Sequence, residues 1–480
     1  MSEELEQLEL LLAHADTHQP VLPSGLDEEA LFQAPRPEAP RPSKYLRSEL
    51  KSLDDLPAQR WGLVVPEGPE GARLLKLVAP LRERRQRDQG GCPVQVYCVR
   101  PGMDREAAHD WKARVFGSEQ VEEEDRPCYL LILGDLDGVS LELQQVLATD
   151  SLVGRLAFPA DEGYRAYVEK VLRWEDTPAS VERARLLLYT SRDGTRATRL
   201  GHSRLMEPCF QSSLERQRLG KLRAQPPMPL AEEGGGSGSS VRRFLSFADS
   251  AEPAVLLSLS HGLGMPDQRP WASPDEQRAL QGALLLPGGE QFTAAEVESR
   301  SFLPGGMWFG LACFSAGTPS RSAYAPWLRE LPAVSPGPAR AVALLPAEGE
   351  RPFVAALPQA ALANPRGPLV VMGHMDLAWS ASFNDQGRDR HSRFLHVIEA
   401  LAHQYRAGAA LAPLFRAANE VGMRLSASYH EERADRDAGR QPRLTPAERA
   451  YLWLLYHDLS SYVLLGDPAV RLPLAGGKAK

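Results

Sequence analysis

The 480-residue sequence predicts an α/β protein, built as a three-layer α/β/α sandwich around mostly parallel sheets. Two observations predict this class. Short and almost wholly apolar runs recur along the chain, as expected for strands that are buried on both faces. Amphipathic stretches of helical length alternate with these runs. The alternation predicts two consecutive subdomains, over residues 58–180 and 181–475.

The first subdomain is expected to begin with a strand at 61–66 and an amphipathic helix at 71–86. Further strands are predicted at 94–99, 128–135 and 153–158, and further helices at 141–147 and 166–175. Residues 1–57 come before this region and contain a proline-rich run at 34–42. We expect a disordered arm there, either a plain tail or an interaction arm, and the composition favours the tail.

The second subdomain is expected to carry the larger sheet. Its predicted strands are 183–190, 254–262, 306–317, 367–375 and 461–473, and its predicted helices are 392–405, 412–430 and 445–460, with a charged break at 431–443. Between the first two strands a proline run precedes a glycine–serine run, so residues 219–243 are expected to form a mobile loop. That loop is either a place where cleavage activates the protein or only a surface insertion.

Composition excludes several classes of function. The net charge is −7, and no cluster of basic and aromatic residues suggests a nucleic-acid or membrane partner. The start of the chain lacks an export signal and no apolar run is long enough to span a bilayer, so we expect a cytoplasmic protein. The five cysteines form no CxxC pair, which argues against a zinc site or disulfide framework. No metal or cofactor is expected.

Two predicted strands end in residues that can carry chemistry. The run SLSHG ends in His261 and Gly262, and the run FGLACFSAG contains Cys313. Ligands gather at the carboxyl ends of parallel strands, so an imidazole and a thiol can meet there if the two strands are neighbours. Such an imidazole can take the thiol proton and make a strong nucleophile. The other interpretation is a buried, inert cysteine and a histidine that only shapes a turn.

The order of several motifs favours the first interpretation. Six strand motifs follow one another along the chain. The first three are a strand ending in Gly-Asp at LLILGD (130–135), a Gly-Arg strand at VGRLAF (153–158) and a His-Gly strand end at SLSHG. The next three are an Ala-Cys strand end at LACFSAG, a strand followed by Trp at VVMGHMDLAWSASF (370–383) and a final Gly-Asp-Pro strand at LLGDPAVRLP (464–473). In this order they resemble the gingipain-type, caspase-fold cysteine peptidases. The resemblance covers about Cys128 to Pro473 and implies a caspase-like fold and thiol-protease activity.

Carried over residue by residue, the resemblance implies that His261 is the base and Cys313 the nucleophile. It also implies that the backbone amides of Gly262 and Cys313 form an oxyanion hole, and that Trp379 lines the pocket for the residue before the cleaved bond. The implied partner is a protein or peptide substrate, with a regulatory protein as a further expectation.

One departure concerns specificity. Arg-specific members have a pocket aspartate near the position that His202 occupies here. Glu207 or Asp376 is then the candidate carboxylate that would pair with a basic substrate residue in the pocket. The other interpretation of Glu207 is an exposed acid at the start of a helix, where a negative charge is favourable. His374 is expected to be a structural loop residue, because two ligands do not make a metal site.

Three hypotheses follow from these observations. The first is a cysteine endopeptidase acting on an intracellular protein. The second is a caspase-fold scaffold or regulator without activity, which would have no need of a thiol and an imidazole at neighbouring strand ends. The third is another Cys–His enzyme, such as an acyltransferase, which only product analysis separates from a peptidase.

Overall fold

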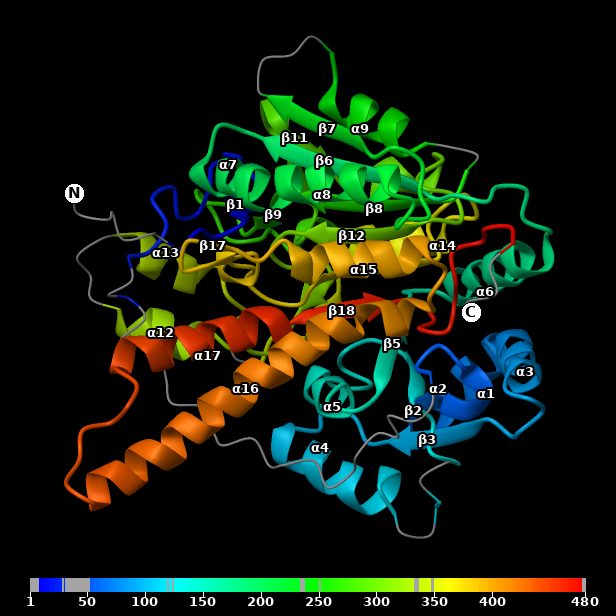
Figure 1. Cartoon of the computed structure of the whole chain (residues 1–480), viewed down its shortest axis with the longest axis horizontal. Helices are drawn as coiled ribbons and strands as arrows, with labels where there is room; N and C mark the ends of the chain where they lie inside the picture. Colours follow the sequence, from blue (N-terminus) through cyan, green and yellow to red (C-terminus); the bar gives the residue numbers. More distant parts are fainter. Residues whose placement is uncertain are drawn as a thin grey trace.

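A single ten-stranded sheet runs through the molecule in the computed structural model, in the order β3-β2-β4-β5-β18-β15-β12-β8-β6-β7 (Figure 1). The structure describes residues 8–27, 30, 52–118, 121–122, 125–233, 238–249, 252–331, 336–346 and 349–476. The first half of the sheet consists of the parallel strands β2 (Trp61–Pro66), β3 (Gln95–Val99), β4 (Tyr129–Leu133) and β5 (Leu152–Leu156). The second half consists of the parallel strands β6 (Arg185–Arg192), β7 (Met228–Glu233), β8 (Ala254–Leu259), β12 (Met307–Leu311) and β15 (Val370–His374).

The two halves meet at β18 (Tyr462–Leu465), which comes from the end of the chain. This strand is parallel to β5 and antiparallel to β15, so the halves run in opposite directions within one sheet. The two predicted subdomains therefore share a continuous sheet. The predicted last strand at 461–473 is regular over only four residues, because the chain turns away at Gly466, whose φ is 116°.

Helices cover both faces of the first half. Leu63 and Val65 of β2 lie in the same hydrophobic cluster as α2 (Pro69–Leu77), α3 (Ala79–Asp88) and α6 (Asp161–Asp176). Val64 points the other way, into a separate cluster with α4 (Arg105–Trp111) and α5 (Leu141–Leu147). Successive side chains of a strand point to opposite faces, so an uninterrupted apolar run needs a helical layer on each side.

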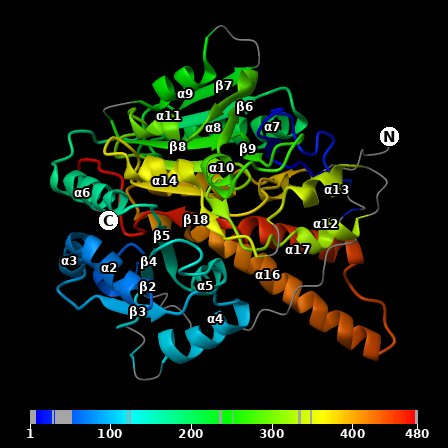
Figure 2. The same cartoon turned by 180° about the vertical axis from the view of Figure 1, so that it is seen from behind.

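The second half is layered in the same way. Helices α8 (Glu207–Arg218) and α15 (Ser392–Ala402) lie on one face and α14 (Ala356–Ala363) on the other (Figures 1 and 2). The remaining helices are α1 (Leu56–Gln59), α7 (Arg196–Gly201), α9 (Ser240–Ala248), α10 (Pro274–Leu280), α11 (Ala294–Glu298), α12 (Ala325–Glu330), α13 (Pro336–Ala343), α16 (Ala407–Asp437) and α17 (Pro446–Ser460). The predicted three-layer α/β/α architecture is confirmed.

A second, smaller sheet lies beside the carboxyl ends of the second half. Its order is β1 (Leu12–His14), β9 (His261–Gly264), β10 (Leu284–Leu286) and β11 (Glu290–Phe292). Short two-residue strands form two further pairs, β13 (Gly317–Thr318) with β14 (Phe353–Val354) and β16 (Asn384–Asp385) with β17 (Arg388–Asp389).

Strand β1 belongs to the region expected to be disordered, and for residues 8–27 that expectation is wrong. Leu10, Leu11 and Leu12 are at most 1% exposed. Burying three leucines favours order strongly enough to outweigh the polar residues around them. The proline-rich run at 34–42 lies outside the described residues.

Two other local expectations are also corrected. Residues 228–233 of the expected mobile loop form β7, an exposed edge strand, which is where proline is tolerated in a sheet. The predicted helix at 71–86 is two helices, because Pro80 lies in the first turn of α3 and cannot donate to a continuing helix. Residues 234–237 of the loop lie outside the described part of the chain.

The charged break expected at 431–443 is helical as far as Asp437, where α16 ends (Figure 1). Glu432 pairs with Arg436 one turn later, at 2.9 Å, and with Arg449 of the packed helix α17, at 3.2 Å. These ion pairs let a highly charged sequence remain in a helix.

A buried polar cluster joins the turn that follows β18 to the first half of the sheet and its helices. The Asp467 carboxylate accepts hydrogen bonds from Arg85 Nε at 2.7 Å and from Trp61 Nε1 at 3.0 Å. Arg85 also pairs with Glu175 at 2.6 Å, and both Arg85 and Asp467 are at most 1% exposed. The Gly-Asp-Pro motif thus positions β18 between the two halves of the sheet.

Candidate functional site

His261 and Cys313 lie just beyond the ends of two neighbouring strands. Strands β8 and β12 are parallel and paired up to Leu259 and Leu311, and each candidate residue follows its strand by two positions. The chain carrying His261 then leaves the large sheet and continues as β9 of the small sheet. Both side chains are fully buried.

Gly262 brings these two strand ends into backbone contact. A Cβ atom on Gly262 would lie 1.9 Å from the carbonyl oxygen of Cys313 and 3.1 Å from its nitrogen. No side chain fits in that space, so the backbone on either side depends on glycine at this position.

Gly262→Ala is therefore expected to lower the free energy of unfolding by about 1–3 kcal/mol, because backbone atoms must move to admit the methyl group. The measurement is thermal or urea unfolding. Gly264→Ala is the matched control in the same strand, because its nearest neighbour is the flexible side chain of Leu12 at 3.0 Å. Equal destabilisation by the two variants would contradict the assigned close approach.

His261 is held by a turn that follows β6, the strand on the other side of β8. Its Nε2 lies 3.0 Å from Thr195 Oγ1 and 3.5 Å from Asp193 Oδ2. Its Nδ1 has no hydrogen-bond partner among the described residues. Burial lowers the pKa of His261, and the nearby Asp193 charge opposes that shift. The ring is thus neutral by preference, with Nδ1 available as an acceptor.

Sequence reasoning missed Asp193 and Thr195, although a signal was present. Both follow the end of a predicted parallel strand, which is the same rule that singled out His261 and Cys313. The Asp193 carboxylate accepts from the Thr195 hydroxyl at 2.7 Å and from the Thr198 hydroxyl at 2.8 Å. These contacts fix the carboxylate beside the imidazole.

The thiol of Cys313 lies against the loop that follows β15. The Ala378 amide donates to the sulfur at 3.1 Å. Burial raises the pKa of Cys313, and the Ala378 hydrogen bond opposes that shift. Phe314, the next residue, has φ of 55°, a left-handed conformation that is uncommon for a non-glycine residue. Backbone strain of this kind clusters at functional sites.

The amides of Gly262 and Cys313 converge on one oxygen atom, the carbonyl oxygen of Leu11. The Gly262 amide donates at 2.9 Å and the Cys313 amide at 3.1 Å. Two backbone donors that point at one carbonyl oxygen have the geometry of an oxyanion hole. These are the two donors expected from the sequence, and the chain's own N-terminal segment fills the space between them.

Trp379 contributes to the site through its backbone. It forms a bridge with Leu10, and its amide donates to Asp458 at 2.9 Å. Its ring is fully buried and packs against Tyr324 and Trp327, with centroid distances of 5.8 and 5.5 Å. The backbone of loop 377–380, rather than the indole ring, forms the hydrogen bonds with the N-terminal segment.

The three polar pocket candidates have other partners. The Asp376 carboxylate accepts from Ser322 Oγ at 2.7 Å and from two backbone amides, and burial raises its pKa to about 6. Glu207 is exposed and accepts from Gln211 at 2.7 Å. His202 lies in a π-helical turn with Nδ1 at 3.4 Å from Thr190 Oγ1. Asp376 lies near Cys313, because its carbonyl oxygen accepts from the Phe314 amide at 3.0 Å and, besides burial, its charge raises the pKa of the Cys313 thiol. No hydrogen bond or ion pair of the described residues joins Glu207 or His202 to Cys313.

His374 contacts the loop that follows β15 and the end of α17 through its two ring nitrogens. Its two ring nitrogens lie 2.8 Å from the Asp376 carbonyl oxygen and 3.0 Å from the Asp458 carbonyl oxygen. Burial by itself would lower the pKa of His374, but the hydrogen bond to Asp458 and its charge outweigh burial and raise it. No group of three or more potential metal ligands occurs within the described residues.

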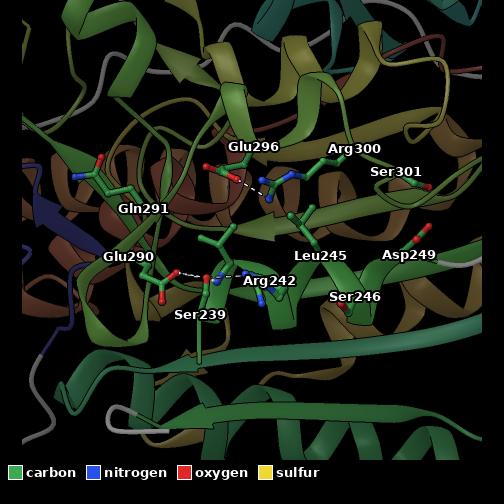
Figure 3. A pocket seen from close by; sticks show the side chains of 11 residues that line it. Ser239, Arg242, Leu245, Ser246, Asp249, Glu290, Gln291, Glu296, Arg300 and Ser301 are labelled. Carbon is green, nitrogen blue, oxygen red and sulfur yellow. Dashed lines mark hydrogen bonds and ion pairs between the residues drawn. The ribbon is translucent and has the colours of Figure 1, made fainter. Parts of the chain in front are cut away.

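A separate surface hollow of about 570 Å³ lies between α9, β11 and α11 (Figure 3). Glu290 there accepts from Ser239 Oγ and the Ser240 amide, and Arg300 pairs with Glu296 at 2.9 Å. Its lining includes neither His261 nor Cys313. Among the described residues, no helix has both the length and the apolar character needed to cross a membrane.

No protein-family model matches the sequence, and neither does a curated protein. Among solved structures, the chain is similar to the Arg-specific cysteine proteinase gingipain R, with 10% identity, a TM-score of 0.47, and 89% of this chain and 80% of that chain covered. It is similar to the complex of Porphyromonas gingivalis RgpB pro- and mature domains, with 11% identity, a TM-score of 0.47, and coverages of 86% and 79%. It is also similar to the Saccharomyces cerevisiae separase–securin complex, with 9% identity, a TM-score of 0.33, and coverages of 76% and 17%.

Proposed function

We propose that the protein is a cysteine endopeptidase in which Cys313 is the nucleophile and His261 the general base. The observation that carries this proposal is the pair of amides, from Gly262 and from the thiol-bearing residue Cys313, that both donate to one peptide carbonyl oxygen. An oxyanion hole already holding a peptide carbonyl is suited to acyl transfer from a peptide. A scaffold without activity needs no such arrangement.

The proposed reaction follows from these groups. The thiol proton passes to His261 Nδ1, and the thiolate attacks the carbonyl carbon of the substrate peptide bond. The negative oxygen that forms is stabilised by the Gly262 and Cys313 amides. The imidazolium returns the proton to the departing amine as the C–N bond breaks, leaving a thioester on Cys313. Water, deprotonated by His261, then hydrolyses the thioester to a carboxylic acid and restores the thiol.

Asp193 is proposed to position His261. Its carboxylate lies beside Nε2, so it favours the tautomer that leaves Nδ1 unprotonated and stabilises the imidazolium formed during the reaction. A protein or peptide substrate is part of this proposal, and an intracellular location of that substrate stays a prediction.

The proposal is tested by incubating the protein with a diverse peptide library in ¹⁸O-labelled water and reading the products by mass spectrometry. Hydrolysis by any route places one ¹⁸O atom in the new carboxylate, so the label identifies water as the acceptor of the acyl group. Protein alkylated at Cys313, confirmed by peptide mapping, is expected to be inactive. Products that carry an added amine or alcohol in place of water would identify an acyltransferase, and cleavage that survives alkylation would exclude Cys313 as nucleophile.

A further inference from the structure

The N-terminal segment 8–14 crosses the candidate site as an extended strand. Before Leu11, it pairs with loop 377–380: the Leu11 amide donates to Ala378 O at 3.2 Å, and the Ser380 amide donates to Glu9 O at 3.1 Å. After Leu11, it forms β1 and runs parallel to β9, with Leu12 opposite Gly262. The segment is therefore held by backbone hydrogen bonds on both sides of the Leu11–Leu12 peptide bond.

Leu11 is the residue of this strand that contacts the two candidate oxyanion-hole amides. Its carbonyl oxygen is the atom that accepts from the Gly262 and Cys313 amides, and its side chain is 1% exposed. A peptide bound this way presents the carbonyl carbon of Leu11 to the thiol-bearing residue. Leu11 thus occupies the place of the residue before a cleaved bond, and the subsite around it accepts an aliphatic side chain.

The segment closes the site as well as filling it. With residues 8–14 in place Cys313 and His261 are fully buried. The segment is also tied down beyond the site, because Val21 donates to Leu12 O at 2.9 Å, and Leu8 and Leu26 exchange backbone hydrogen bonds at 2.8 and 2.9 Å. Residues 8–26 therefore form a loop closed by backbone hydrogen bonds, drawn in dark blue in Figure 1, and its first strand contacts the Cys313 amide through the Leu11 carbonyl oxygen.

We infer that residues 8–14 are bound as the chain's own substrate-like strand, which keeps the site latent and marks peptides with leucine before the cleaved bond as the preferred substrates. This inference rests on the proposed function and names its regulation and specificity. It replaces the expectation of a basic residue in the pocket, since a leucine fills that place. A substrate or an activating partner must displace the strand to reach Cys313.

Glu9 makes this displacement sensitive to pH. Its side chain is 1% exposed, pairs with Arg196 at 3.0 Å and also faces Arg199. Burial raises the pKa of Glu9 to about 7 from its ordinary 4.5, against the opposing charges of the two arginines. A pKa raised in the docked state means that docking favours the protonated carboxyl. Docking is therefore strongest at a pH below 4.5 and weakens as the pH rises through about 7.

The first test measures access to Cys313 and does not depend on catalysis. Full-length wild type and Leu11→Asp are treated with iodoacetamide, and alkylation is followed at each cysteine by peptide mapping. Burying an unpaired carboxylate at this position is unfavourable, so the Leu11→Asp substitution is expected to release the strand. Iodoacetamide should then alkylate Cys313 in the variant about tenfold faster or more than in wild type. Cys209, buried in α8, is the internal control and is expected to stay unreactive in both proteins. Equal alkylation of Cys313 in wild type and variant would overturn the inference.

A second arm measures inhibition and pH dependence. Hydrolysis of acetyl-Leu-Glu-Leu-X-coumarylamide by Leu11→Asp is expected to be about tenfold faster or more with X as Leu than as Arg or Asp. A synthetic peptide of residues 6–27 is expected to inhibit hydrolysis by the Leu11→Asp variant, whereas the same peptide carrying Leu11→Asp is not.

The pH dependence is measured in the full-length protein with Leu11 in place. The rate of Cys313 alkylation is expected to rise between about pH 5 and about pH 8 more steeply in wild type than in Glu9→Gln. The glutamine side chain stays neutral, so the variant shows the rise that comes from ionisation of the thiol alone.

The two arms separate the two proposals. Faster alkylation of Leu11→Asp without any peptide hydrolysis would support the covering strand and contradict the peptidase. Hydrolysis by wild type at the rate of Leu11→Asp, with a preference for Arg or Asp before the cleaved bond, would support the peptidase and overturn the strand as a substrate-like inhibitor.

Discussion

Cys313→Ala is expected to abolish peptide cleavage, with kcat/KM reduced by about 10³-fold or more, because no other group can form the thioester. His261→Ala is expected to cause a loss of similar size, since it removes the proposed general base. Both effects are measured most clearly in a Leu11→Asp background, in which the site is open. The double variant with Cys313→Ala and His261→Ala is expected to lose little more activity than either single variant, because the two residues act as a unit.

The control for Cys313→Ala is Cys209→Ala, which removes the same atom from another fully buried position. It is expected to retain activity, and each variant should unfold within about 1–2 kcal/mol of wild type. Substantial activity in Cys313→Ala, with its fold intact, would contradict the assignment of the nucleophile.

Asp193→Asn separates positioning from chemistry at the same site. Asparagine can still accept from Thr195 and Thr198 through its carbonyl oxygen, but it brings no charge to the imidazole. The pKa of His261 is then expected to fall further, because burial is no longer opposed. We expect kcat to fall about 10–100-fold and the acid limb of the pH–rate profile to move to lower pH. An unchanged profile would show that Asp193 only shapes the turn.

Asp467→Ala is expected to lower the free energy of unfolding by about 3–5 kcal/mol, because it leaves Arg85 buried without one of its counter-charges. The variant also removes the acceptors of Trp61 Nε1 and of the Ala469 amide. The cluster joins the turn after β18 to the first half of the sheet, so the loss should appear as a lower midpoint in urea or thermal unfolding.

Glu162→Ala is the matched control for a carboxylate in an ion pair. Glu162 pairs with Arg165 at 3.3 Å, but its side chain is 80% exposed. An exposed pair contributes about 1 kcal/mol or less, so this substitution should leave the unfolding midpoint nearly unchanged. A similar effect of both substitutions would show that the buried cluster does not hold the two halves of the sheet together.

The sequence by itself determined the architecture and the two central residues of the candidate site. The continuous apolar runs at 61–66, 128–135 and 254–262 could be buried only in a sheet with helices on both faces. The rule that ligands gather at strand ends then selected His261 and Cys313. These features depend on local pattern and on the alternation of elements, which a single sequence carries.

Tertiary structure alone decided which strands became neighbours and what covers the site. The sequence did not show that β18 would join two sheets running in opposite directions, because that pairing depends on the distant cluster of Asp467, Arg85 and Trp61. Nor did it show that residues 8–14 would be ordered. Their leucines look like a short run in a polar tail, and their stability comes from backbone partners more than 240 residues later in the chain, at Gly262 and Cys313. Hydrogen bonding and burial between segments so far apart leave no local signal, which is why the cover over the site appears only in the folded chain.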